Sequence, residues 1–171
     1  GVTEAMSNQL EQISFGGRIH LDPINGVPLT STGKTSSGEL IGTHGTPVSN
    51  LTDAKALLGL KGFEEIHVMN DLEIWATDHV DSLVLAGHGL GKTFLNVITG
   101  SSTSATRFKD IGVIGACDGA IIADRALFYD VTGVGCTTNT MVMTDCLFAG
   151  NITLRADNDQ DLNIINGGSI S

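Results

Sequence analysis

The sequence is poor in aromatic residues. They make up 5% of its 171 positions, with one tryptophan and one tyrosine. Grooves that bind sugars usually need exposed rings, which present a large rigid surface with a polar edge. The only such candidates, Trp75 and Tyr129, lie far apart in the sequence. The scarcity of rings therefore disfavours a carbohydrate-binding protein.

Basic residues are also few. Nine Lys and Arg oppose 19 Asp and Glu, which gives a formal net charge of −10. No basic stripe exists to neutralise phosphates, which argues against a nucleic-acid partner. The longest apolar runs fall short of a membrane span. No charged segment followed by an apolar segment opens the sequence, so no secretory signal is visible.

The three cysteines, Cys117, Cys136 and Cys146, lack metal-ligand spacing. An odd number of cysteines without a visible signal favours reduced, buried thiols. A Cys136–Cys146 disulfide across neighbouring rungs is the less favoured alternative, since it requires the two Cα atoms to lie within about 7 Å. The five histidines also show no helical metal-ligand spacing and are expected at the surface or in turns. They are His20, His44, His67, His79 and His88.

Glycine is abundant, at 22 residues, and the last third of the chain repeats loosely. Four pieces each place an Asp or Asn two positions after an apolar residue, at 108–111, 122–125, 143–146 and 164–167. Such a repeat is typical of a solenoid, in which stacked units bury a face that one unit cannot bury alone. The alignment predicts an inward stack of Phe108, Ile122, Met143 and Ile164. It places Asp110, Asp124, Asp145 and Asn166 at the corners.

These features predict a mainly all-β fold, a right-handed parallel β-helix with a short capping α-helix and an N-terminal helical and extended arm. Three stacked Asp side chains would repel one another, which counts against the predicted register. Short strands are expected at 65–69, 72–76, 82–86 and 93–98. The predicted organisation is an assembly arm at 1–45, followed by the capping helix and the β-helix at 46–171.

Two helices are predicted before these strands, and weak alternation at 15–21 indicates a further strand between them. Apolar residues at helical spacing predict a helix over 2–13 that is too short to be stable alone and suits a short coiled-coil stalk, with a frayed terminus as the alternative. Residues 29–45 should form an exposed loop. Ser49 or Asn50 should cap a second helix, with Gly59 or Gly62 at its end. Its predicted apolar face consists of Leu51, Ala54, Leu57 and Leu58.

Residues 86–93 (Ala-Gly-His-Gly-Leu-Gly-Lys-Thr) are similar to a phosphate-binding loop. Ala86 stands where that motif has Gly, and residues 94–98 predict a strand rather than the helix that must face the phosphates. A Gly-rich turn is therefore favoured.

Asp110, Asp124 and Asp145 are the only stacked carboxylates that could serve a glycosidase or a calcium site. Structural residues at corners are the favoured interpretation.

Residues 24–28 (Ile-Asn-Gly-Val-Pro) and 41–54 (Ile-Gly-Thr-His-Gly-Thr-Pro-Val-Ser-Asn-Leu-Thr-Asp-Ala) resemble a family of tailed-bacteriophage virion proteins. In that family an N-G-V-P-G-T turn precedes I-G-T-P, then P-V-N-N-L-x-D-A, a short helix and a β-helix. Leu29 replaces a Gly, an insert spans 31–40, and Ser49 replaces the first Asn. The resemblance covers about residues 15–100.

The resemblance implies a structural component of a virion, assembled in the host cytoplasm. It would be a decoration, spike or fibre attached to capsid, neck or tail. Its implied partners are copies of itself, as a homotrimer, and other virion proteins. The resemblance supplies no catalytic, cofactor-binding or metal-binding residues, and no enzymatic activity is expected. A tailspike-type protein that binds or cleaves host surface polysaccharide remains the alternative.

Overall fold

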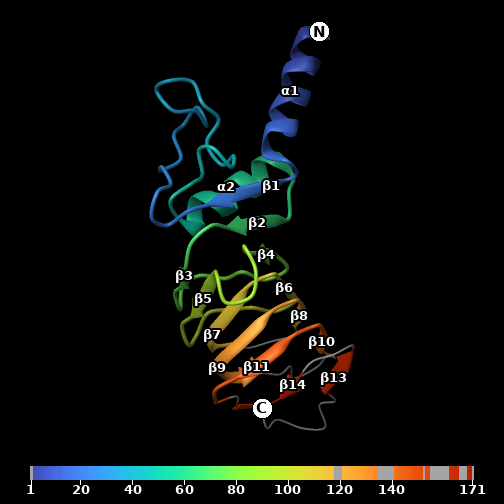
Figure 1. Cartoon of the computed structure of the whole chain (residues 1–171). Helices are drawn as coiled ribbons and strands as arrows, with labels where there is room; N and C mark the ends of the chain where they lie inside the picture. Colours follow the sequence, from blue (N-terminus) through green and yellow to red (C-terminus); the bar gives the residue numbers. More distant parts are fainter. Residues whose placement is uncertain are drawn as a thin grey trace. The chain divides into compact units, whose positions relative to one another are not determined.

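In the computed structural model the chain is mainly β, with two α-helices and parallel sheets (Figure 1). The structure describes residues 2–117, 121–134, 141–151, 153–154, 162–165 and 169–170. The chain divides into two compact units, residues 1–70 and 71–171. The all-β class expected from the sequence agrees with this architecture.

The first unit holds both helices. Its elements are α1 (Val2–Phe15), β1 (Arg18–Leu21), α2 (Leu51–Lys61) and β2 (Glu65–Val68). The loop between β1 and α2 carries no named strand. Both helices, and the strand expected at 65–69, occur where the sequence predicts them.

Helix α2 begins and ends as its flanking residues predict. Asn50 accepts a hydrogen bond from the Asp53 amide through its side chain at 2.9 Å, the usual role of an N-cap. At the other end Gly62 adopts φ +71° and its amide bonds the Leu58 carbonyl, which closes the helix. The predicted apolar face, Leu51, Ala54, Leu57 and Leu58, is buried.

Strands β1 and β2 pair in parallel and carry matching sequences. Arg18-Ile-His-Leu21 lies in register with Glu65-Ile-His-Val68. Because side chains alternate along a strand, one face buries Ile19, Leu21, Ile66 and Val68, each completely. The other face carries an Arg18–Glu65 ion pair at 3.0 Å and the two histidines.

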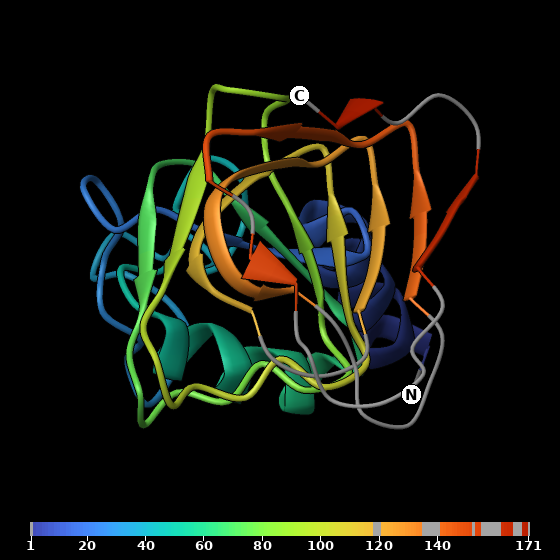
Figure 2. The ribbon, with the colours of Figure 1, turned by 90° about the horizontal axis from the view of Figure 1, so that it is seen from below.

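The second unit consists of short strands in two sheets, coloured green to red in Figure 1 and seen from below in Figure 2. One sheet has the order β4-β6-β8-β10-β13, and the other β14-β11-β9-β7-β5-β3, with β12 paired to β9. The named pairs are parallel. The strands are β3 (Leu72–Ile74), β4 (Val84–Ala86), β5 (Phe94–Val97), β6 (Thr106–Lys109), β7 (Gly112–Ala116), β8 (Ile121–Asp124), β9 (Leu127–Val134), β10 (Met141–Thr144), β11 (Leu147–Ala149), β12 (Thr153–Leu154), β13 (Leu162–Ile165) and β14 (Ser169–Ile170).

The predicted inward stack is wrong by one residue at β8. Phe108 and Met143 both pair with Ala123, which is 1% exposed, whereas Ile122 is 36% exposed. A shift of one residue moves a side chain to the opposite face of a sheet, so Ile122 points outward. In the other sheet Phe128 pairs with Phe148, and their rings stack with centroids 5.4 Å apart.

The same shift of one residue changes which residue occupies the corner after β8. Asp110 and Asp145 lie just after β6 and β10 with φ near +52° and +51°, the left-handed conformation expected of corner Asp residues. At the corresponding position after β8 stands Arg125, with φ +51°, and not Asp124. A cation therefore separates two of the acids that the predicted register would have brought into repulsion. Asn166 lies outside the described residues.

Candidate functional site

The exposed face of α1 is the most prominent apolar feature of the first unit. Met6, Leu10 and Ile13 are 57%, 64% and 74% exposed. At about 100° per residue these three side chains lie within about 60° of one another on the helix. Met6, Leu10 and Ile13 form the apolar stripe of α1. It has the spacing of a helix that packs against another helix.

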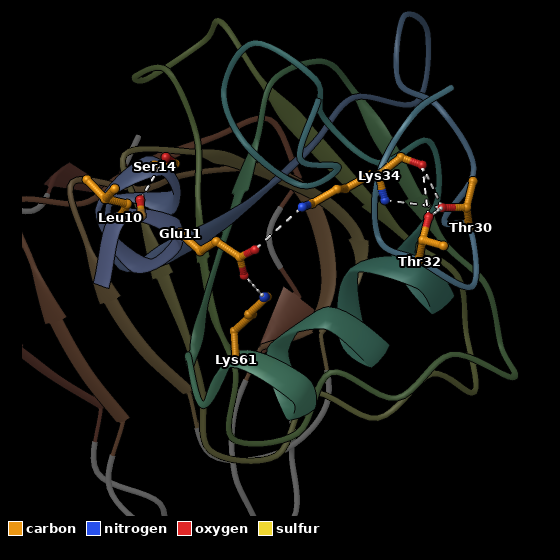
Figure 3. A network of polar contacts seen from close by, with 7 residues as sticks. All are labelled: Leu10, Glu11, Ser14, Thr30, Thr32, Lys34 and Lys61. Atoms are coloured by element: carbon orange, nitrogen blue, oxygen red, sulfur yellow. Dashed lines mark hydrogen bonds and ion pairs between the residues drawn. The ribbon is translucent and has the colours of Figure 1, made fainter. Parts of the chain in front are cut away.

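The opposite side of α1 is fixed to the body of the unit. Phe15 lies about 180° from Met6 on the helix, and its ring is 1% exposed. Glu11 projects from the same side and meets two lysines (Figure 3). Its two oxygens lie 3.2 Å from Lys61 Nζ and 3.8 Å from Lys34 Nζ. The stripe therefore points away from the unit that carries it.

A cavity of about 250 Å³ lies beside these charges. It is bounded by the last turns of α1 and α2 and by residues 29–34 and 40–41 of the intervening loop. Its wall includes Phe15, Ile41 and Leu57, each at most 2% exposed. Lys61 also stands 5.2 Å from the centre of the Phe15 ring, a cation–π contact. The cavity thus combines an apolar wall with a charged edge.

Internal hydrogen bonds hold the loop that forms one wall. The Thr30 hydroxyl donates to the Lys34 carbonyl at 2.8 Å and accepts from the Lys34 amide at 3.2 Å. The Ile41 amide bonds the Gly33 carbonyl at 3.0 Å. The Leu29 amide donates to Asp53 on α2 at 2.8 Å. The loop predicted at 29–45 is largely exposed, as expected, yet Ile41 anchors it in the core.

Three histidines of the first unit cluster, which the sequence interpretation missed. His20 and His67 are register partners with ring centres 5.5 Å apart, and His44 meets His20 edge-on, also at 5.5 Å. His20 is buried, at 8% exposure. The matching Ile-His pairs of β1 and β2 were the signal that could have revealed this cluster. No three His, Cys, Asp or Glu residues in the described ranges lie so as to hold a metal ion.

Two of the candidate carboxylates are engaged with one cation. Arg125 donates from Nε and Nη2 to Asp110 at 2.6 and 3.0 Å, and from Nη1 to Asp124 at 3.0 Å. These two acids raise the pKa of the Arg125 guanidinium above its ordinary value, chiefly through the hydrogen bonds to Asp110. Asp110, at its corner, and Asp124, at the end of β8, are therefore both engaged in ion pairs with Arg125.

The sequence similar to a phosphate loop has a different structure. It follows β4, as expected, but leads into the strand β5 (Phe94–Val97) where a phosphate loop requires a helix. Thr93 is fully buried, and its hydroxyl accepts a hydrogen bond from the His88 amide at 3.3 Å. The interpretation as a Gly-rich turn is confirmed.

Cys117 and Cys146 are free, buried thiols. Burial raises the pKa of Cys117 to about 12 and also raises that of Cys146. Cys136 lies outside the described residues.

The rings of Trp75 and Tyr129 are 56% and 46% exposed. In the described parts of the chain, neither helix combines the length and apolar character needed to cross a membrane.

Comparison with protein-family models, with curated proteins and with solved structures found no match to this chain.

Proposed function

We propose that this protein is a non-enzymatic structural component of a tailed-phage virion. Its second unit is a right-handed parallel β-helix, and residues 1–45 form the arm through which the protein assembles and attaches to capsid, neck or tail. The protein acts as a rigid decoration, spike or fibre through protein–protein contacts.

The apolar stripe of α1 is the observation that carries this proposal. A helix of 14 residues is marginal on its own in water, and three of its apolar side chains, Met6, Leu10 and Ile13, face solvent. In the heptad that places Met6, Leu10 and Ile13 at core positions, the flanking residues Ser7, Gln9 and Ser14 are uncharged. Copies of α1 can therefore pack side by side without like-charge repulsion, as a homotrimer requires.

The parallel sheets of the second unit support the β-helix. Strands from the two sheets alternate along much of the chain, and each pairs with a strand of the same sheet further along. The positive φ angles of Asp110, Arg125 and Asp145 recur where the chain leaves one sheet, as repeated corners require. The resemblance of residues 24–54 to virion proteins adds the biological setting.

Polysaccharide binding is the second candidate function. The exposure of Trp75 and Tyr129 favours it, because a sugar needs an accessible ring face. Against it stands the engagement of Asp110 and Asp124 by Arg125, which leaves these two acids poorly suited to act as the acid and base of a glycosidase.

Antibody fragments raised against the purified chain test the proposal directly. Electron microscopy should show them at one defined position on intact phage particles produced by cells that express the gene. An absence of label on complete particles, with the chain recovered only from the soluble lysate, would refute the virion role. Release of reducing ends from host surface polysaccharide by the pure chain would instead support the second candidate.

A further inference from the structure

We propose that the cavity of the first unit is a binding site for a monocarboxylate with a compact apolar body. The cavity lies among the last turns of α1 and α2 and the loop at 29–41, and its volume is about 250 Å³. The class of ligand follows from the size of this space, from its apolar wall and from the charges at its edge.

The apolar part of the ligand has a suitable place. Leu29 and Leu40, both half-buried, and Leu60, at 76% exposure, present accessible apolar surface to the cavity, whereas the lining residues Phe15, Ile41 and Leu57 are almost fully covered. Its volume of about 250 Å³ exceeds the roughly 150 Å³ of a cavity that holds benzene, so this space accommodates one ring or one branched aliphatic group.

The charged edge selects an anion. Lys34 and Lys61 approach the single carboxylate of Glu11, so these three groups carry a formal charge of about +1 in a chain of net charge −10. Lys34 Nζ is 3.8 Å from Glu11, too long for a direct hydrogen bond, and its side chain is 47% exposed. An ammonium group has three donors, so Lys34 retains donors for an incoming carboxylate.

Glu11 demonstrates that a carboxylate fits between these two lysines (Figure 3). It also competes with the ligand for them. The Glu11→Gln variant removes the competing charge and keeps the shape of the side chain. It therefore distinguishes a binding site from a contact that is purely structural. Binding of an added carboxylate should strengthen in this variant, whereas a contact that only anchors α1 gives no such gain.

Titration of the full chain with phenylacetate, followed by amide chemical shifts, tests the proposal. Saturable shifts of Leu29, Leu40 and Lys34 are expected, with a dissociation constant on the order of millimolar for so small a ligand. Lys34→Met should weaken binding about three- to tenfold, and Glu11→Gln should tighten it about threefold. The matched control Lys92→Met, in a turn of the second unit, should leave the affinity unchanged.

Three further measurements complete the test. Phenylacetamide, which has the same ring without the charge, should bind at least about threefold more weakly. Leu40→Phe, which enlarges a lining side chain, should abolish the shifts while the circular dichroism spectrum stays that of the folded chain. A peptide with a C-terminal Phe is compared in two forms, one with a free terminal carboxylate and one with an amidated terminus. This comparison shows whether a chain terminus can supply the carboxylate. Binding of the free-carboxylate peptide alone supports the proposal.

The proposal is overturned if phenylacetate fails to saturate the shifts or binds no better than phenylacetamide. Unchanged affinity in both Lys34→Met and Glu11→Gln would equally overturn it.

Discussion

Arg125 binds Asp110 through two hydrogen bonds, from Nε to Oδ1 at 2.6 Å and from Nη2 to Oδ2 at 3.0 Å. The register of β6, β8 and β10 places Arg125 at the position that corresponds to Asp110 in one neighbour and to Asp145 in the other. A positive side chain thus separates two negative ones along the sheet. Bidentate pairing of this kind fixes geometry as well as charge.

Replacement of Arg125 by Asn should lower the midpoint of thermal unfolding by a few degrees. Asn tolerates the left-handed backbone angle at this position, so the change removes the charge without adding backbone strain. The loss should shrink in high salt, because the groups are exposed and screened. An equal loss at low and high salt would show that charge is not the cause.

Gly42→Ala should destabilise the first unit by about 2–4 kcal/mol. Gly42 has φ +98°, and an added Cβ would lie 2.7 Å from Leu57 Cδ1 and 3.1 Å from Phe15 Cε1. Gly33→Ala is the matched control, since Gly33 has φ +69° but no atom within 4 Å of the added Cβ. It should cost roughly 1 kcal/mol. Urea denaturation measures both, and equal costs would refute the predicted clash.

Asp22→Asn should destabilise the protein by about 1–3 kcal/mol at neutral pH. Asp22 is 4% exposed and accepts hydrogen bonds from the Ile24 and Asn25 amides and from Asn70, at 2.8 to 3.0 Å. Burial, the largest single influence, would raise the pKa of Asp22, but the hydrogen bonds from Asn25, Asn70 and Ile24 outweigh it and lower the pKa.

The sign of the pH effect follows from that lowered pKa. The stabilisation by Asp22 is complete above the unfolded pKa of about 3.9 and is lost as pH falls through the folded value. The difference in unfolding free energy between wild type and Asp22→Asn should therefore be constant from pH 7 to 5 and shrink below about pH 4. A difference that grows on acidification would contradict the assignment.

Cys117 should resist alkylation in the folded protein. Burial raises its pKa to about 12, so very little of the reactive thiolate exists at pH 8. Peptide mapping by mass spectrometry should show iodoacetamide labelling of Cys117 slowed at least about 100-fold relative to the guanidinium-denatured chain. Similar rates in the two states would mean that the thiol is accessible in solution.

Local signals in the sequence predicted the helices and most strands. Ser49 or Asn50 and Gly59 or Gly62 bracketed the ends of α2, because short side-chain acceptors favour N-caps and glycine favours the left-handed position after a helix. The structure uses Asn50 and Gly62. Short apolar segments bounded by Gly, Asn and Asp located β2 to β5. These features depend on neighbouring residues, which a sequence displays directly.

Register was harder to predict, because it depends on partners distant in the sequence. Ile122 has a larger apolar side chain than Ala123, so the sequence favours Ile122 as the inward residue. In the structure Ala123 faces inward beside Phe108 and Met143. The contacts of Glu11 with Lys34 and Lys61 connect residues as many as 50 positions apart. No spacing rule links such residues, so the cavity beside them was not predicted.

The mass of the full chain in solution, measured by light scattering, tests the proposed assembly role of α1 most directly. Wild type should have the mass of a trimer. Leu10→Glu places a charge in the apolar stripe, where Leu10 is 64% exposed, and should yield monomers. Asn8→Glu adds the same charge about 200° from Met6 on the helix and should remain a trimer. A wild-type chain that is monomeric at all concentrations would contradict the account.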